Sequence, residues 1–315
     1  MKGATRLAFC DIGTNAILLL IVEISCDGRF AVLDDLAEIP RLGEGVDGST
    51  RIGTEGERRS LKVLHRYLER CRELAVDEIV VVGTSALRDA TNSREVLARM
   101  NQQLGLGVRV LSGHEEAVYS FLAVQRGLHF GAAKLLVVDV GGGSTELIWG
   151  DARGMDRAVS INLGAVRLTE RFLHSDPVAD EEWAAMEAFI DRELGRLGSR
   201  GSERVESLTL VGIAGTFTTL AAVEKGLTQY SHVEVHGCLL TLTEVTRQVG
   251  VYQKMCVAER KLIPGLEPQR ADVILAGASL VQKIMQWFGA AAVIVSDEGV
   301  RYGLLYERLA GLNSC

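Results

Sequence analysis

One short segment occurs twice in related form, and this repeat constrains the fold more than any other feature of the sequence. The first copy is LAFCDIGTN, residues 7–15, and the second is LVVDVGGGS, residues 136–144. Each copy has an apolar strand, an Asp, a glycine-containing turn and a hydroxyl residue, followed by more apolar sequence. One such segment opening each half of the chain predicts two related lobes around a central cleft.

Short aliphatic runs bounded by Gly or Asp alternate with helical patterns along the chain, which indicates an α/β fold. Apolar spacings of three and four residues predict helices over 61–71 and 96–104. We expect domains at 1–127 and 128–315, with a final helical segment, 301–315, that could pack back on the first lobe. The expected buried strands are 7–10, 79–82, 108–111, 135–138, 208–211 and 291–295.

Length, charge and cysteine content indicate which classes of protein the chain can belong to. A chain of 315 residues, 47% of them hydrophobic, is long enough for two cores. The net charge is -7 and there is no long run of Lys and Arg, so we expect no nucleic-acid partner. The six cysteines are scattered, which fits reduced thiols in a cytoplasmic protein. The apolar run near the N-terminus is too short for a signal peptide or a membrane span, so we expect no membrane partner.

The second copy of the repeat is the strongest local signal. Its glycines let backbone N–H groups approach phosphate oxygens without Cβ clashes, and its hydroxyls can donate further hydrogen bonds. Asp139, at the strand end, can hold Mg²⁺, usually through water. The alternative is a tight hairpin that only needs glycines. The residues of this candidate phosphate loop are Gly141, Gly142, Gly143, Ser144 and Thr145.

The first copy is weaker by itself, because a plain hairpin explains it equally well. Its candidate metal ligand is Asp11, and its candidate phosphate loop contains Gly13, Thr14 and Asn15. Two Asp-Gly turns at corresponding points of two lobes would hold an anionic chain and its cation from both sides. A single hairpin cannot supply that arrangement.

A carboxylate at a helix start is the candidate general base. Ser112 and Glu115 fit the S-x-x-E capping box, so Glu115 has a structural task. Glu116, one residue further on, can point into the cleft and take a proton from an attacking water. The alternative is that Glu116 only interacts favourably with the helix dipole.

Two arginines and a third glycine turn are further candidates for phosphate contacts. Arg41 and Arg88 carry guanidinium groups that suit phosphate oxygens, although surface salt bridges are the alternative. Gly215 and Thr216 lie where a strand leads into a helix and can present N–H groups there. The alternative is a glycine-rich helix entry capped by Thr218 or Thr219. The chain has no P-loop motif, no dinucleotide-binding fingerprint and no zinc-ligand spacing.

Taken in order, these motifs resemble those of the Ppx/GppA phosphatase family, a branch of the superfamily that contains actin, sugar kinases and heat-shock chaperone ATPases. The resemblance implies two ribonuclease H-like lobes and Mg²⁺-dependent release of terminal phosphate from polyphosphate or from guanosine pentaphosphate (pppGpp). It implies that Glu116 is the base and that Asp139 helps to hold the metal or the lytic water. The matching segments are 11–15, 41–45, 83–92, 112–117, 139–147, 212–222, 235–237, 270–272 and 296–301.

Longer members of that family add a C-terminal helical domain, and the chain is similar to the short, two-lobe form. We also expect a homodimer. Three positions depart from the family pattern: Ala16, Leu275 and Tyr302. Two other functions stay open, a phosphotransferase with an organic acceptor and a non-hydrolytic sensor of polyphosphate or ppGpp-like nucleotides. The sequence does not choose between polyphosphate and pppGpp, because the discriminating contacts lie beyond the reacting phosphate.

Overall fold

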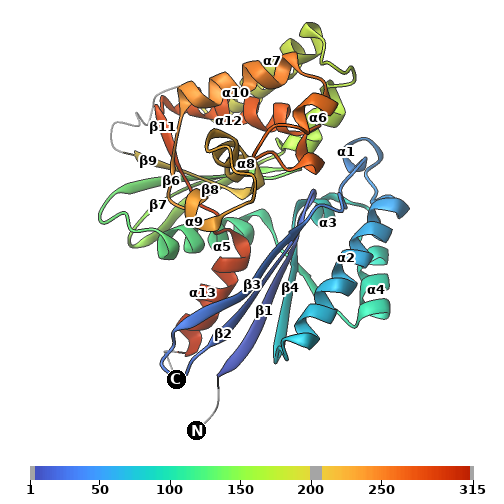
Figure 1. The fold of residues 1–315 in the computed structure, drawn as a ribbon, viewed down its shortest axis with the longest axis vertical. Helices are drawn as coiled ribbons and strands as arrows, with labels where there is room; N and C mark the ends of the chain where they lie inside the picture. Colours follow the sequence, from blue (N-terminus) through green and yellow to red (C-terminus); the bar gives the residue numbers. More distant parts are fainter. Residues whose placement is uncertain (1–3, 199–207, 313–315) are drawn as a thin grey trace. The chain divides into compact units, whose positions relative to one another are not determined.

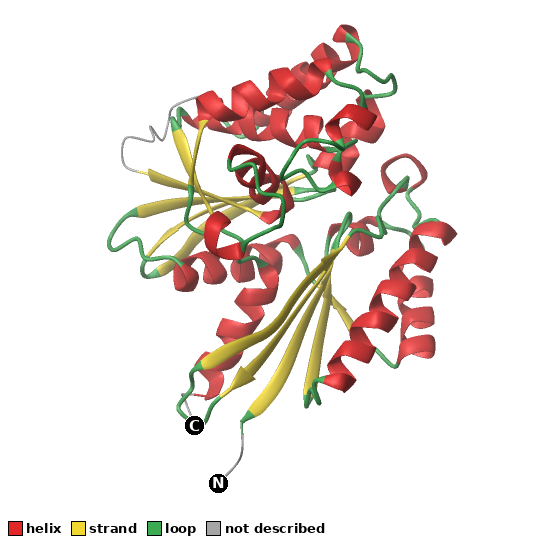
Figure 2. Cartoon of the chain, viewed as in Figure 1, coloured by secondary structure: helices red, strands yellow, loops and turns green. Residues whose placement is uncertain are grey.

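The computed structural model describes residues 4–198 and 208–312, which form two compact α/β units (Figures 1 and 2). The first unit contains the chain up to Ala123 together with the segment from Val300, and the second unit is Val124–Gly299. The predicted domains, 1–127 and 128–315, have a single boundary after residue 127. In the structure the chain leaves the first unit and returns to it at the final helix.

The first unit is built on a five-stranded sheet with the order β3-β2-β1-β4-β5. Strands β1, β2 and β3 are antiparallel neighbours, whereas β4 and β5 run parallel to β1. The strands are β1 (Thr5–Ile12), β2 (Ile17–Ile24), β3 (Phe30–Glu38), β4 (Glu78–Gly83) and β5 (Val108–Val110). The helices are α1 (Val46–Ser49), α2 (Thr54–Glu73), α3 (Ser85–Asp89), α4 (Ser93–Leu104), α5 (Gly113–Gly127), which continues into the second unit, and α13 (Val300–Leu312).

Both faces of this sheet are buried, because side chains alternate between the faces along each strand. Ala8, Cys10 and Ile12 of β1 pack with side chains of α2 and α4. Leu7 and Phe9, on the other face, pack with side chains of α5 and α13. Figure 1 shows α2 and α4 on one side of the sheet and α13 on the other. The final helix therefore completes the core of the first unit. The last part of the segment predicted as helix, residues 313–315, lies outside the described residues.

The second unit is built on a six-stranded sheet with the order β10-β11-β9-β6-β7-β8. Helix α12 is buried along most of its length and contacts α6, α7, α8 and α10. The strands are β6 (Lys134–Val140), β7 (Thr145–Asp151), β8 (Gly154–Ile161), β9 (Leu208–Ile213), β10 (Leu239–Thr241) and β11 (Ala292–Val295). The helices are α6 (Ala165–Phe172), α7 (Asp180–Gly195), α8 (Ala214–Glu224), α9 (His232–Val235), α10 (Leu242–Lys254), α11 (Val257–Arg260), the 3₁₀ turn η2 (Pro268–Arg270) and α12 (Ile274–Phe288).

The two sheets share one strand order. In the first unit it is β3-β2-β1-β4-β5, and in the second β8-β7-β6-β9-β11, with β10 added antiparallel to β11. In both sheets three antiparallel strands lie next to two further strands. These two run parallel to β1 in the first unit and to β6 in the second. This is the ribonuclease H-like arrangement of the actin-like ATPase fold, so the predicted fold class is confirmed. Strands β1, β4, β5, β6, β9 and β11 occupy the six predicted strand positions.

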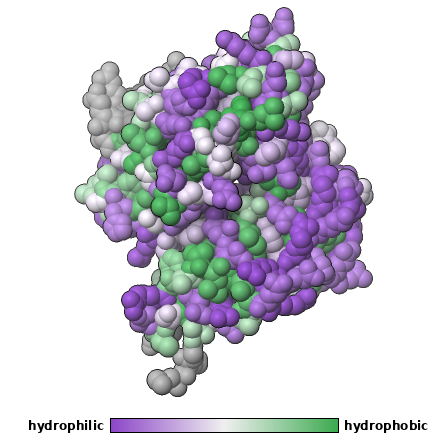
Figure 3. All heavy atoms as spheres, in the orientation of Figure 1, coloured by the Kyte–Doolittle hydropathy of each residue, from purple (hydrophilic) through white to green (hydrophobic). Residues whose placement is uncertain are grey.

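The visible surface is largely polar. On the face shown in Figure 3, hydrophilic side chains gather over α2, and apolar side chains form smaller groups. Within the described ranges, none of the helices combines the length and the apolar character that crossing a membrane requires. Within the same described ranges, six large apolar side chains are exposed: Val32, Val118, Tyr230, Val233, Leu239 and Leu262.

Candidate active site

The repeated segments form the same tight turn in both units. In the first unit the N–H of Gly13 donates to the C=O of Ala16, with an N···O distance of 2.9 Å. In the second unit the N–H of Gly141 donates to the C=O of Ser144 at 3.0 Å. Each turn joins two antiparallel strands directly after an Asp-containing strand end. The repeat seen in the sequence is therefore a repeat of backbone structure.

The second turn is fastened to the start of α6. Its carbonyls at 141–143 accept hydrogen bonds from the N–H groups of Ala165 and Val166, at 3.0 and 2.9 Å, and from Nε of Arg167, at 2.8 Å. In a trans peptide the N–H points opposite to the preceding C=O. The N–H groups of 142–144 therefore point away from α6. Successive N–H groups on one side of a turn form an anion-binding concavity.

Gly164 lets α6 approach this turn closely. A Cβ atom at Gly164 would lie 2.4 Å from the carbonyl oxygen of Gly142 and 2.6 Å from the nitrogen of Gly143. Any larger residue would have to displace backbone atoms of the turn. The glycine thus fixes the position of the candidate phosphate loop.

The first turn is held by the segment that contains Arg41. The C=O of Asn15 accepts from the N–H of Arg41 at 3.0 Å, and the C=O of Thr14 accepts from the N–H of Gly43 at 2.9 Å. By the same peptide geometry, the N–H groups of Asn15 and Ala16 point away from this segment. The backbone N–H of Arg41 therefore helps to hold the candidate phosphate loop of the first unit in place.

Side chains of the first turn also have unused hydrogen-bonding capacity. Thr14 and Asn15 are 8% and 7% exposed, and among the described residues Thr14 Oγ1 and Asn15 Oδ1 have no hydrogen-bond partner. A buried polar atom without a partner is unfavourable by about 1–3 kcal/mol. A ligand that bonds to these atoms would relieve that penalty. Thr145 differs, because its fully buried hydroxyl donates to the C=O of Leu163 at 2.7 Å.

Two buried carboxylates lie opposite each other in the second unit. Asp139 of β6 pairs in register with Glu146 of β7, and the two residues are 7% and 1% exposed. Glu146 Oε1 also accepts a hydrogen bond from Ser160 Oγ at 2.7 Å. Like charges directly opposite on a sheet are unfavourable, and carboxylate oxygens are the donors that Mg²⁺ prefers. This donor set fits a magnesium ion.

The sequence analysis missed Glu146, although the residue lies within the quoted motif. The signal that could have found it is the hairpin register, because the turn from Gly141 to Ser144 forces residue 146 to lie opposite residue 139. In the first unit the equivalent register sets Asp11 opposite Leu18. The carboxylate pair therefore belongs to the second turn only.

The candidate base lies at the carboxyl edge of the first sheet. Strands β1, β4 and β5 are parallel neighbours, and Asp11, Arg88 and Glu116 occur at or just after their carboxyl ends. Glu116 is 8% exposed, and its Oε2 accepts a hydrogen bond from Nη1 of Arg88 at 2.9 Å. Arg88 also donates to the C=O of Leu111 at 3.0 Å. Arg88 thus forms a largely buried salt bridge with the candidate base, which differs from the surface salt bridge given as the alternative.

The helix start beside Glu116 is capped as predicted. Ser112 Oγ accepts from the N–H of Glu115 at 3.2 Å, and Glu115 Oε2 accepts from the N–H of Ser112 at 2.8 Å. The hydrogen bonds confirm the capping box and leave Glu116 outside it. Burial raises the pKa of the Glu116 carboxyl above its ordinary value, and the hydrogen bond and charge of Arg88 lower it in part. A carboxylate with a raised pKa is a stronger base than an exposed glutamate.

The third glycine turn has a neighbour from a segment that matched the family motifs without a predicted role. A Cβ atom at Gly215 would lie 2.3 Å from Nη1 of Arg270, so the guanidinium rests directly on this glycine. The match at 270–272 did not predict this contact, because tertiary packing makes it. Capping by Thr218 or Thr219 is wrong, since α8 begins at Ala214 and both hydroxyls donate to the C=O of Gly215. Thr216 Oγ1 lies 3.4 Å from the C=O of Val140.

Two units with this strand order, each opening on an Asp and a tight glycine turn, define a protein of the actin-like ATPase fold class. Within that class the chain belongs to the Ppx/GppA phosphatase family, whose sequence profile matches residues 20–311. The resemblance drawn from the motifs is confirmed.

Three proteins illustrate the similarity. Exopolyphosphatase 2 of Mycobacterium tuberculosis is 35% identical, over 98% of this chain and 99% of its own length. The bifunctional 3-dehydroquinate synthase/phosphatase of Fusobacterium nucleatum is 30% identical over 95% of this chain, which spans only 46% of that protein. The crystal structure of the Aquifex aeolicus family member has a TM-score of 0.80 and 33% identity, covering 98% of this chain and 99% of its own.

Proposed function

We propose that this protein releases orthophosphate from the end of an inorganic polyphosphate chain by Mg²⁺-assisted attack of water, with Glu116 as general base. The observation that carries the proposal is the buried Glu116 carboxylate, held by Arg88 at the sheet edge where the Thr14 turn lies. Membership of a phosphatase family supports hydrolysis. The name of the 35% identical relative, an exopolyphosphatase, supports polyphosphate as the substrate.

Phosphate oxygens would bind to the two turns in different ways. In the second unit they would accept hydrogen bonds from the N–H groups of 142–144. In the first unit the side chains of Thr14 and Asn15 would contribute together with the backbone. Arg41, Arg88 and the N–H groups at Gly215 and Thr216 would offset further negative charge. That both turns bind one polyanion stays a prediction.

Asp139 and Glu146 would hold the magnesium ion, and Asp11 is the candidate ligand of the first unit. When bound, Mg²⁺ neutralises negative charge on phosphate oxygens and makes the phosphorus easier to attack. The register of β6 and β7 supports this assignment, because it brings two carboxylates together at a buried position.

In the proposed reaction Glu116 takes a proton from water while the water oxygen attacks the terminal phosphorus. The bond from that phosphorus to the bridging oxygen breaks, and orthophosphate and a chain shorter by one phosphate leave. Positioning and electrostatics supply most of the acceleration in such reactions. Arg88 keeps part of the Glu116 population ionised, since it opposes the effect of burial on the pKa.

Glu116→Gln tests the base directly. Turnover should fall by a factor on the order of 10²–10⁴, while polyphosphate binding stays close to wild type because Gln has the same shape. The wild-type kcat/KM should fall as the pH drops through the raised pKa of Glu116, since protonation removes the base, and the variant should lack this limb. The measurements are orthophosphate release against pH and a binding titration.

Glu115→Gln is the matched control for this test. Glu115 is the neighbouring carboxylate and serves the helix cap. Gln also fits the capping box, so Glu115→Gln should lower stability by at most about 1 kcal/mol, through loss of the charge at the helix start, and leave turnover unchanged. Near-wild-type phosphate release from Glu116→Gln would remove Glu116 from the role of base.

Substrate choice is tested by comparing kcat/KM for long-chain polyphosphate and for pppGpp under the same conditions. We expect the larger value for polyphosphate, and phosphate release that needs Mg²⁺ but no organic acceptor. A larger value for pppGpp would contradict the proposed substrate. Strict dependence on an organic acceptor would favour a phosphotransferase.

A further inference from the structure

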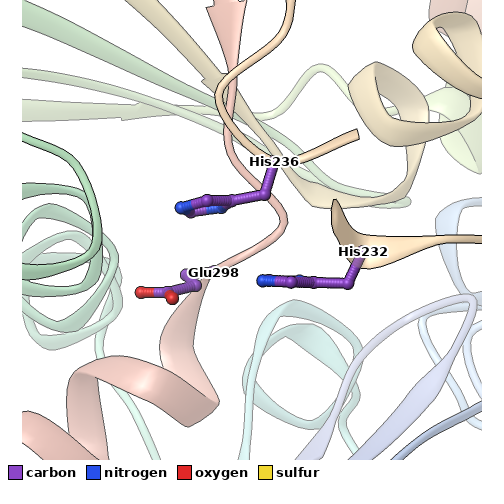
Figure 4. Close-up of side chains that lie close together, drawn as sticks. All are labelled: His232, His236 and Glu298. Carbon is purple, nitrogen blue, oxygen red and sulfur yellow. The ribbon is translucent and has the colours of Figure 1, made fainter. Parts of the chain in front are cut away.

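A second group of metal-ligating side chains lies within the second unit and takes no part in the proposed reaction. Figure 4 shows its three members, His232, His236 and Glu298. One possible ligand atom from each residue can be chosen so that all three atoms lie within 4.8 Å of one another. His232 begins α9, His236 directly follows that helix, and Glu298 follows β11. The prediction that the chain has no zinc-ligand spacing overlooked His232 and His236, which are four residues apart in the sequence. The third ligand comes from a distant strand end, which spacing does not reveal.

The two imidazole rings are already oriented for a common ligand. They stack with centroids 4.9 Å apart and an interplanar angle of 16°. Figure 4 shows their tips pointing to the same side, toward the carboxylate of Glu298. His232 Nδ1 lies 3.1 Å from Oδ2 of Asp297, a contact that assigns the proton to Nδ1 and the lone pair to Nε2. A carboxylate on the second nitrogen is the usual support of a metal-bound histidine.

Glu298 is held in place by a glycine. Its side chain is largely buried, with the residue 7% exposed, and a Cβ atom at Gly127 would lie 2.1 Å from Glu298 Oε2. His236 has only long hydrogen bonds: Nε2 is 3.4 Å from the C=O of Gly127, and Nδ1 is 3.3 Å from the N–H of Asp297. An ion could replace such contacts at little cost.

We propose that His232, His236 and Glu298 bind a divalent transition-metal ion of the zinc class. Two imidazole nitrogens and one carboxylate oxygen suit such ions, whereas Mg²⁺ prefers oxygen ligands alone. Three protein ligands leave a fourth position for water. Gly127 ends α5, through which the chain enters the second unit, and Glu298 directly precedes Gly299, where the chain leaves it. The Glu298 ligand therefore packs against the segment through which the chain enters this unit.

The test is a titration of the full chain, stripped of metal, with Co²⁺ followed by its visible absorption, and then displacement by Zn²⁺. We expect one equivalent to bind in the wild type. His232→Ala should lose this binding and still fold, because the side chain is 42% exposed. Asp297→Asn should weaken binding by about 10- to 100-fold through the orientation of His232. His65→Ala is the control, since His65 is an exposed histidine on α2 of the first unit that pairs with Glu69, and its loss should leave binding unchanged.

Gly127→Ala adds a variant that keeps every ligand. Its new methyl group must push the Glu298 carboxylate aside, so binding should weaken more than tenfold without loss of a donor. X-ray absorption of the zinc-loaded wild type should show nitrogen and oxygen ligands at about 2.0–2.2 Å and no sulfur. Equal Co²⁺ binding by His232→Ala and the wild type, no binding by the wild type, or sulfur in the zinc shell would each overturn the proposal.

Discussion

The turn at Gly13–Ala16 and the turn at Gly141–Ser144 close with the same hydrogen bond, yet they offer a ligand different groups. The first carries Thr14 and Asn15, whose side chains are buried with polar atoms that lack partners in the described structure. The second carries glycines, and α6 holds its carbonyls so that its N–H groups point the other way. One backbone design thus provides a side-chain site in one unit and a backbone site in the other.

The cross-strand pairs next to the two turns differ as well. Asp139 faces Glu146 across the hairpin of the second unit, whereas Asp11 faces Leu18 in the first. Only the second hairpin therefore has a pair of carboxylates for a cation. The comparison teaches that a duplicated turn can keep its geometry while its two copies divide the tasks of anion binding and cation binding.

The largest expected effect concerns this carboxylate pair. Glu146→Gln should raise the Mg²⁺ concentration for half-maximal phosphate release by a factor on the order of 10 or more, because it removes one charged ligand. Asp11→Asn, the variant of the first unit, should raise it less, since Leu18 offers no second carboxylate there. Activity measured against Mg²⁺ concentration checks both. A larger shift for Asp11→Asn would break the assigned division of tasks.

A smaller effect is expected when valine replaces Thr14 of the first turn or Thr145, which follows the second. Thr14→Val should raise KM for polyphosphate and leave stability unchanged or increased by up to about 1 kcal/mol, since the lost hydroxyl has no partner among the described residues. Thr145→Val should lower stability by about 1–3 kcal/mol, because the C=O of Leu163 loses its donor. Urea unfolding and steady-state kinetics measure the two quantities. A stability loss in Thr14→Val as large as that in Thr145→Val would refute the contrast.

Local patterns in the sequence were enough to predict the parts of the site that depend on a few consecutive residues. The repeat around Asp11 and Asp139 predicted two equivalent turns, because a strand end followed by glycine has few conformations available. The capping box at Ser112 and Glu115 was predicted for the same reason. The α/β class followed from the alternation of strands and helices, and the ribonuclease H-like form of the two lobes was implied by the resemblance of the motifs to the Ppx/GppA family.

Features that depend on strand register or tertiary packing could not be predicted in this way. Glu146 becomes a partner of Asp139 only once the hairpin register is known. The hydrogen bond from Arg88 to Glu116 requires β4 and β5 to be neighbours, and the contact of Arg270 with Gly215 joins distant parts of the chain. The alternative in which Thr218 or Thr219 caps α8 was wrong because it placed the start of that helix too late.

The most direct test is an NMR titration of Glu116→Gln, in which turnover should be strongly reduced and binding kept, with tripolyphosphate and Mg²⁺. The backbone amide signals of Asn15 and Ala16 in the first unit and of Gly142, Gly143 and Ser144 in the second report on the two turns. The account predicts that both sets shift together with a single Kd. Shifts confined to one turn, or two separate Kd values, would contradict the claim that the two turns serve one phosphate chain.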